Sequence, residues 1–359
     1  MKIPLNKILL LFCAVTCFNI TVQGQNSVKF KVRIAQWQGN KSGAVSVTFD
    51  DAGYSQYLYA YPVLKASNLK ATFSIVGQWV EDEPSWSAEP GSFEIRKMGW
   101  KQLLELASDG HELAAHGFYH EKYVKTLAVS DLVVDMNQIK DLIATKSNLP
   151  VYTMHYPYSY ASGNIPAAVA KAGYLFGRTG LDTINPPSPP DMYLLATQVI
   201  LNNNTPDSMQ FRRWIESANG NWLILMYHHV FPEDSKEMSL IREHNVTNSY
   251  SLTPESFEKQ INALVESGLW IAPTGDVGRY ILERDSTAVR MVKAGRKLHV
   301  YTLTNLDTDV FNVPLTLVVK VPWKKVKVSG SLSDGIVETV NNELVIDVLP
   351  EQEIILTKD

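Results

Sequence analysis

Residues 44–51 read Ala-Val-Ser-Val-Thr-Phe-Asp-Asp, a run suited to a buried strand that ends in two adjacent acids. Continuous runs of this kind are typical of parallel strands covered by helices on both faces. Between about residues 28 and 284 such runs alternate with helical patterns, which predicts βαβ units and a parallel sheet or barrel. The predicted strands are Ala44–Phe49, Lys70–Val76, His111–Ala115 and Trp222–Tyr227, and the predicted helices are Ser55–Ala66, Trp100–Ser108, Ser130–Ser147, Ile165–Ala172 and Thr253–Ser267.

The pattern changes after Arg284. Residues 285–359 hold short runs rich in Val, Leu and Thr, separated by turn sequences such as Asp334-Gly335, and no helical pattern continues there. This texture predicts a small all-β sandwich. The expected organisation is therefore a first domain over residues 25–284 and an accessory β-sandwich domain over residues 285–359.

The N-terminus predicts export. Lys2 and Lys7 precede the apolar run Ile8–Val15, and small residues lead to a cleavage point before Gln25, which is the layout of a signal peptide over residues 1–24. An uncleaved anchor is the alternative. We expect a periplasmic, cell-surface or extracellular protein without a stable membrane span after cleavage. Both cysteines lie in this segment, so the mature chain has neither disulfides nor a cysteine metal site.

The charge of the chain bears on whether it binds nucleic acid. The chain has 359 residues and a formal net charge of −4, whereas nucleic-acid binders usually carry a basic stripe. We therefore expect no nucleic acid as partner, and no protein partner is evident.

Histidine spacing points to a metal. His111 and His116 are five residues apart, one too many for two ligands on one helical face. His116 and His120 are four apart, so a single turn would bring both rings to one ion. Two histidines alone are equally consistent with no site, and a carboxylate ligand is required. Asp50 and Asp51 supply candidates at a strand end, although Asp51 could instead cap the following helix.

Four motifs taken together resemble a known family. They are Thr48-Phe49-Asp50-Asp51, His116-Gly117-Phe118-Tyr119-His120, Tyr156-Pro157-Tyr158 and Leu225-Met226-Tyr227-His228. Their order and spacing are similar to those of polysaccharide deacetylases, the carbohydrate esterases with NodB homology. The resemblance covers about residues 28–284. It implies a distorted (β/α) barrel and a metal-dependent hydrolase that removes acetyl groups from a carbohydrate.

The resemblance also implies roles for single residues. Asp51, His116 and His120 would be the metal ligands. Asp50 would be the general base and His228 the general acid, with His229 the competing candidate for the acid. A His₂Asp set leaves coordination positions open and favours Zn²⁺, while Co²⁺, Ni²⁺ or Mn²⁺ also suit it.

The sequence departs from the family at the supporting residues. His155 stands where an arginine usually orients the base, and Asp182 begins a fourth motif that lacks its second acid and its tryptophan. Arg178 lies near that motif and is expected either to replace the missing charge or to be a surface arginine. A backbone N–H near Tyr158 is expected to stabilise the oxyanion.

Aromatic residues suggest sugar contacts. Tyr158 and Trp86 are expected to be exposed and to touch the substrate, whereas Trp222 and Trp270 are expected to pack in the interior. The irregular segments 81–99 and 185–191 are expected to form loops near the binding site.

The favoured function is thus a secreted deacetylase acting on an acetylated polysaccharide or oligosaccharide, with the N-acetyl groups of GlcNAc-type polymers preferred. One alternative is an O-acetyl esterase acting on acetylated xylan or a similar glycan, because the same centre serves both leaving groups. The other is a non-catalytic carbohydrate-binding protein, suggested by His155 and the altered fourth motif.

Overall fold

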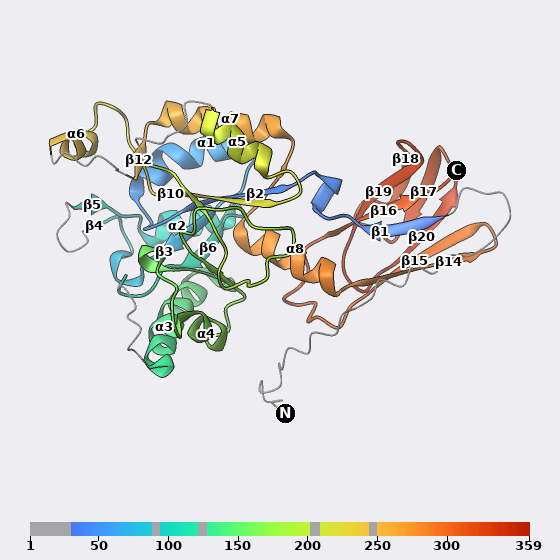
Figure 1. Cartoon of the computed structure of the whole chain (residues 1–359), viewed down its shortest axis with the longest axis horizontal. Coiled ribbons are helices and arrows are strands. Elements are labelled where there is room, and N and C mark those ends of the chain that lie inside the picture. The colour runs from blue at the N-terminus through green and yellow to red at the C-terminus, as the bar shows by residue number, and fades with distance from the viewer. Residues whose placement is uncertain (1–29, 88–93, 121–127, 202–208, 244–249) are drawn as a thin grey trace.

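The computed structural model describes residues 30–87, 94–120, 128–201, 209–243 and 250–359 (Figure 1). The predicted signal peptide lies outside the described residues. No helix within those ranges is both long and apolar enough to cross a membrane.

A parallel sheet of eight strands forms the first part of the chain. Its strands are β2 (Ala44–Phe49), β3 (Thr72–Ile75), β6 (Glu112–Ala115), β7 (Thr153–His155), β8 (Phe176–Arg178), β9 (Gln198–Val199), β10 (Trp222–Tyr227) and β13 (Trp270–Ile271). They follow the order β8-β7-β6-β3-β2-β10-β9, with β13 also paired to β2. An isolated parallel bridge from Arg178 to Leu195 links β8 to the segment before β9. The sheet therefore curves back on itself as the predicted distorted barrel.

Helices cover the outside of this sheet. They are α1 (Tyr61–Ala66), α2 (Trp100–Ser108), α3 (Val129–Ser147), α4 (Ile165–Lys171), α5 (Met209–Ser217), α6 (Lys236–Glu243), α7 (Pro254–Ser267) and α8 (Thr274–Ser286). The Thr253 side chain caps α7 by accepting a hydrogen bond from the Ser256 N–H, and Pro254 occupies the first turn. Inside, Phe49, Phe73 and Phe257 form aromatic contacts in the main apolar core.

Short helices and strands lie in the connections between the main elements. They are η1 (Gln38–Asn40), η2 (Gln56–Ala60), η3 (Gly77–Trp79), η4 (Pro157–Ser159), β4 (Trp86–Ser87), β5 (Ile95–Arg96), β11 (His229–Val230) and β12 (Ser251–Leu252). The η2 segment is a π-helix that leads directly into α1.

The C-terminal region is all-β, as expected. Its strands are β14 (Ala288–Ala294), β15 (Lys297–Leu303), β16 (Leu315–Lys320), β17 (Lys325–Ser329), β18 (Gly335–Glu338), β19 (Glu343–Val348) and β20 (Glu353–Lys358). Together with β1 (Lys31–Ile34) they form two antiparallel sheets, β1-β16-β19 and β14-β15-β20-β17-β18, which share one apolar core. The strand β1 (Lys31–Ile34) corrects the predicted boundary: residues 31–34 were expected in the first domain but pair with β16, because their alternating pattern leaves one apolar face to bury.

The helix α8 joins the two parts of the chain, as Figure 1 shows. Tyr280 packs into the core of the C-terminal sheets and donates a hydrogen bond to the Ala35 carbonyl, whereas Val277 packs against the barrel. At its first turn, the Gly275 N–H donates to the half-buried Glu112 carboxylate at the start of β6. The C-terminal sheets therefore attach at the amino end of the barrel strands.

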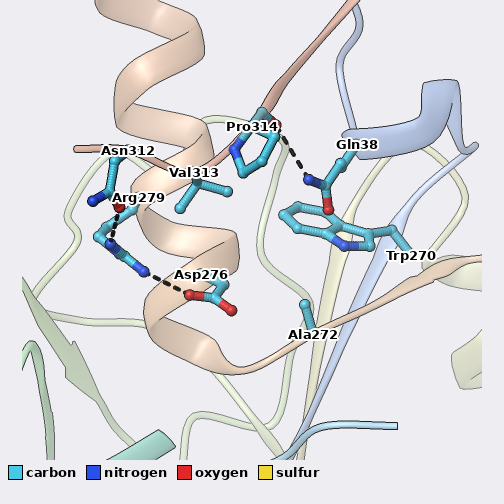
Figure 2. A pocket seen from close by; sticks show the side chains of 8 residues that line it. All are labelled: Gln38, Trp270, Ala272, Asp276, Arg279, Asn312, Val313 and Pro314. Carbon is cyan, nitrogen blue, oxygen red and sulfur yellow. Dashed lines mark hydrogen bonds and ion pairs between the residues drawn. The ribbon is translucent and has the colours of Figure 1, made fainter. Parts of the chain in front are cut away.

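A cavity of about 190 Å³ lies at this junction (Figure 2). The polar side chains of this cavity have hydrogen-bond partners within it. Arg279 donates hydrogen bonds to Asp276 and Asn312, and the Gln38 amide donates to the Pro314 carbonyl. We assign these contacts to the attachment of α8. The remaining lining residues are Trp270, Ala272 and Val313.

Candidate metal centre and catalytic groups

Asp50 and Asp51 follow β2 at the carboxyl end of the barrel, the end at which such folds carry their active sites. Both are buried, and the Asp50 N–H donates to the Tyr227 carbonyl. Asp51 has φ +72°, a left-handed conformation that is costly for a non-glycine residue and that recurs at functional sites. Asp51 does not cap the following helix, because the N-cap of η2 is Ser55.

The side chains of the three predicted metal ligands lie close together. The Asp51 Oδ1 atom lies 3.4 Å from His116 Nε2 and 3.5 Å from His120 Nε2. Within the described residues this buried oxygen accepts no hydrogen bond. Donors about 2.1 Å from a tetrahedral ion lie roughly 3.4 Å apart, so the observed spacing fits such an ion. Asp51, His116 and His120 also form the one group of metal-ligating side chains found within the described ranges.

The His116 ring is oriented for this role. Its Nδ1 lies 2.8 Å from the His155 carbonyl, which can only accept, so Nδ1 carries the proton and Nε2 presents its lone pair. The two histidines do not lie on one helical turn, as the spacing suggested. They lie on a bent loop after β6, because Gly117 and His120 adopt left-handed conformations with φ +75° and +53°.

The Asp50 carboxylate is held by three side chains. Arg178 Nη2 lies 2.7 Å from its Oδ1 and 2.6 Å from its Oδ2, and the Ser74 hydroxyl donates to Oδ1 at 2.8 Å. The His155 Nδ1 lies 3.1 Å from the same Oδ1. Burial alone would raise the pKa of Asp50, but Arg178 and the neighbouring histidines outweigh it and hold the pKa well below its usual range. Asp50 is therefore a carboxylate.

Arg178 is fully buried rather than on the surface. It ends β8, and register with β7 places it beside His155. Burial and the Arg178 charge lower the pKa of His155 to about 3, so that ring is neutral and donates a hydrogen bond through Nδ1. The charge that an arginine at position 155 would bring thus comes from the neighbouring strand.

The two candidate acids lie in different surroundings. His228 is partly exposed, and the charges of Asp51 and Asp50 raise its pKa against the lowering effect of burial. His229 is buried, stacks on Phe231, and packs behind the backbone of Gly53. Burial lowers the pKa of both histidines. The geometry favours His228 for contact with substrate.

Some of the remaining predicted residues are exposed, and others are buried. Tyr158 is about half exposed, and its ring centroid lies 4.8 Å from that of His120. Trp86 is exposed on β4 and Trp222 is fully buried, whereas Trp270 is only partly buried and packs against the core. Asp182 is exposed, and no hydrogen bond or ion pair joins it to the described residues of the site. The support expected of Asp182 is instead supplied by Arg178, whose strand leads into the same loop.

Three supporting residues were not anticipated. The Gln56 amide donates at 2.6 Å to both the Asp50 and the His228 carbonyls, which ties two motifs together. Ser74 bonds Asp50 as described above. Lys97 is buried with its ammonium 4.2 Å from the centre of the Trp79 ring, and its charge lowers the pKa of Asp51. Of these three residues only Ser74 could have been noticed in the sequence, because it is a serine inside the apolar run 70–76.

The polysaccharide deacetylase family model matches residues 38–177. A gellan lyase of a Bacillus species is 22% identical over 80% of this chain, which corresponds to 11% of that protein. A poly-beta-1,6-N-acetyl-D-glucosamine N-deacetylase of Staphylococcus aureus is 23% identical over 48% of this chain and 58% of its own.

Solved structures give weaker likenesses. The chitin deacetylase from the fungal pathogen Colletotrichum lindemuthianum has 17% identity and a TM-score of 0.41 over 66% of this chain and 88% of that chain. The chain spans only part of the curated relatives it matches, a ninth of the lyase and just over half of the deacetylase.

Proposed function

We propose that the chain is a metal-dependent hydrolase of carbohydrate acetyl groups, from the premise that residues 38–177 match the polysaccharide deacetylase family model. The observation that carries the proposal is the convergence of Asp51, His116 and His120 beside the carboxylate of Asp50. The favoured substrate is the N-acetyl group of a GlcNAc-type polymer. The favoured ion is Zn²⁺, since two imidazoles and one carboxylate are ligands that zinc accepts in catalytic sites.

In the proposed reaction Asp51, His116 and His120 hold the ion. The ion, when bound, acidifies a water molecule and polarises the acetyl carbonyl. Asp50 takes the proton of the attacking water, and Arg178 and Ser74 keep its oxygens aimed at one place. Because the tetrahedral oxyanion carries new negative charge, a backbone N–H near Tyr158 is expected to stabilise it.

His228 then protonates the leaving group. The Gln56 amide links the backbone of His228 to that of Asp50, so acid and base keep a constant separation. Without a proton, an amide nitrogen would leave as an anion far more basic than a sugar alkoxide, so N-deacetylation needs this proton more than ester hydrolysis does. Removal of the His228 ring should therefore slow amide hydrolysis more than ester hydrolysis.

The experiment is acetate release by the purified protein with Zn²⁺. An N-acetylglucosamine polymer and acetylated xylan are tested side by side, and Asp50→Asn is the inactive comparison. Release from the first substrate supports the N-deacetylase, and release from the second alone supports the esterase. No release from either, in protein that carries one ion per chain, would contradict the proposal and favour a carbohydrate-binding protein. His228→Ala, assayed on both substrates, tests the acid.

Export belongs to the proposal. The segment 1–24 is expected to be removed, and the N-terminal sequence of protein recovered from outside the cytoplasm should begin at Gln25. An intact N-terminus on membrane-bound protein would indicate an anchor instead.

A further inference from the structure

We propose that Lys97 is the counter-ion of Asp51 when no metal is bound, and that its ammonium group lowers the affinity of the centre for a divalent cation. The inference rests on the proposed function, because it takes Asp51, His116 and His120 as the metal ligands. It adds a residue outside the ligand set that determines how tightly the ion is held.

The backbone of Lys97 is fixed beside the ligands. Lys97 directly follows β5, and an isolated antiparallel bridge pairs it with Gly53. The next N–H along the chain, that of Met98, donates a hydrogen bond of 2.8 Å to the Ala52 carbonyl. Ala52 and Gly53 follow Asp51 directly, so the segment that carries the lysine is bonded to the segment that carries the carboxylate.

The Lys97 side chain is enclosed, and only 4% of the residue is exposed. Its Nζ lies 4.2 Å from the centre of the Trp79 ring, and that ring centre lies 4.6 Å from the centre of the His120 ring. Cation–π contacts of this kind stabilise a charged ammonium group that is out of water. Because a buried charge is screened less than an exposed one, the charge of Lys97 acts on the ligands beside it.

The two carboxylates of the centre each have a cation near them. Arg178 binds the Asp50 carboxylate through hydrogen bonds of 2.6 and 2.7 Å. Burial raises the pKa of Asp51, whereas the neighbouring His116 and then the charge of Lys97 lower it. Since a buried carboxylate without a counter-charge is costly, Lys97 stabilises ionised Asp51 in the absence of metal.

A divalent ion would bind against the charge of Lys97. The ammonium group lies no more than about 9 Å from the centre of the His120 ring, and a ligand nitrogen lies about 2.1 Å from a bound ion. Over roughly 10 Å, at an effective dielectric constant of about 20, repulsion between one and two elementary charges corresponds to about two powers of ten in affinity. Solvent screening removes part of this effect, so loss of the charge should tighten binding about 10- to 100-fold.

The test is the Zn²⁺ affinity of the purified protein, measured in competition with a chromophoric chelator. Lys97→Met keeps a side chain that packs on Trp79 but removes the charge, and we expect its Kd to fall about 10- to 100-fold. Lys97→Arg keeps the charge and should bind within about threefold of the unmodified protein. Lys146→Met is the matched control, because Lys146 also lies over a tryptophan ring, that of Trp100, but its side chain is 39% exposed. The Kd of the control should not change.

Thermal unfolding gives a second readout. Without metal, Lys97→Met should unfold at a lower temperature than the unmodified protein, because Asp51 has lost its counter-charge. The same concentration of Zn²⁺ should then raise the unfolding temperature of the variant by more, since a tighter ligand stabilises the folded state more. Equal shifts in the two proteins would contradict the inference.

Two outcomes of the affinity measurement would also overturn it. An unchanged Kd in Lys97→Met would show that the charge does not act on the ion, and a higher Kd would show that Lys97 only holds Trp79 against His120. No binding by either protein would reject the inference together with the proposed metal site.

Acetate release distinguishes these outcomes from failure of the proposed function. If Lys97→Met binds Zn²⁺ more tightly but neither protein releases acetate, the inference holds and the proposed function fails. If both proteins release acetate and their Kd values are equal, the proposed function holds and the inference fails.

Discussion

Two carboxylates, half-buried Glu112 and buried Asp51, lie at opposite ends of the same sheet and have opposite surroundings. Glu112, at the amino end of β6, accepts hydrogen bonds from the Thr72 and Thr153 hydroxyls at 2.8 and 2.5 Å and from the Gly275 N–H at 2.8 Å. Asp51, at the carboxyl end of β2, has an oxygen with no hydrogen bond from the described residues and two imidazole nitrogens facing it.

This difference distinguishes a carboxylate with a structural role from one with a functional role. Burying a charged group is costly unless partners satisfy it, and Glu112 has them, so its role is to join β3, β6, β7 and α8. The Asp51 Oδ1 atom lacks hydrogen-bond partners among the described residues, and with the two imidazoles it forms a set that fits a cation. Burial of an acid is therefore no sign of chemistry by itself. The atoms left without partners, and what faces them, carry that information.

Removing Asp51 should have the largest effect. Asp51→Ala deletes one of three ligands, and since loss of a residue that merely supports a ligand costs 10- to 100-fold, we expect activity to fall by at least about 100-fold. Metal content, measured by mass spectrometry after dialysis, should drop from one ion per chain to near zero. Full metal occupancy in this variant would show that the ion is held elsewhere.

Substitution of Arg178 tests how the Asp50 carboxylate is stabilised. Arg178→Met leaves Asp50 buried without its cation, which should lower the free energy of unfolding by about 3–5 kcal/mol. Activity should fall roughly 10- to 100-fold because the base loses its orientation. Adding His155→Arg to that variant should restore part of both quantities, since it returns a cation to Asp50 from the adjacent strand. Urea unfolding and acetate release measure them, and no recovery in the double variant would contradict this account.

Glu112→Gln should sharpen the contrast. The amide places an N–H₂ group among donors, so we expect the free energy of unfolding to fall by about 1–3 kcal/mol. Metal content and kcat should stay at the level of the unmodified protein, because the residue lies at the far end of the strands. A loss of metal here would erase the distinction between the two carboxylates.

Glu283 is an intermediate case, and it should show the smallest effect. Its Oε1 accepts a hydrogen bond from the Val313 N–H, while Oε2 has no partner among the described residues. Burial raises the pKa of Glu283 to about 7, with Arg279 lowering it and Asp276 raising it slightly.

The sign of the pH effect follows from that shift. The unfolded chain loses this proton at its ordinary, lower pKa, so the stability contributed by protonated Glu283 is present in acid and is lost as the pH rises through about 7. Relative to the unmodified protein, Glu283→Gln should therefore gain stability between pH 5 and pH 8.5. Thermal unfolding at both pH values measures this difference, and an unchanged difference would show that Glu283 is ionised at both.

Local patterns were sufficient for the strands and for the triad. Trp222–Tyr227 and Trp100–Ser108 form the expected strand and helix with the same bounds, because each run is apolar in the period of its element. The paired motifs placed Asp51 after β2 and His116 and His120 after β6, and these two strand ends meet because only β3 lies between them in the parallel sheet. The partner of β1 could not be predicted, since it lies almost 290 residues away in the sequence.

The sequence by itself determined the alternation of strands and helices, the all-β C-terminal region, and the candidates for base, acid and metal ligands. These depend on periodicity and on residue type at strand ends, which are local properties. Only the tertiary structure decided that Arg178 reaches Asp50 across 128 positions, that Asp182 stays outside the site, and that Tyr250 lies on His228. Those outcomes depend on strand order and register, because a buried charge is satisfied by whichever group the fold brings beside it.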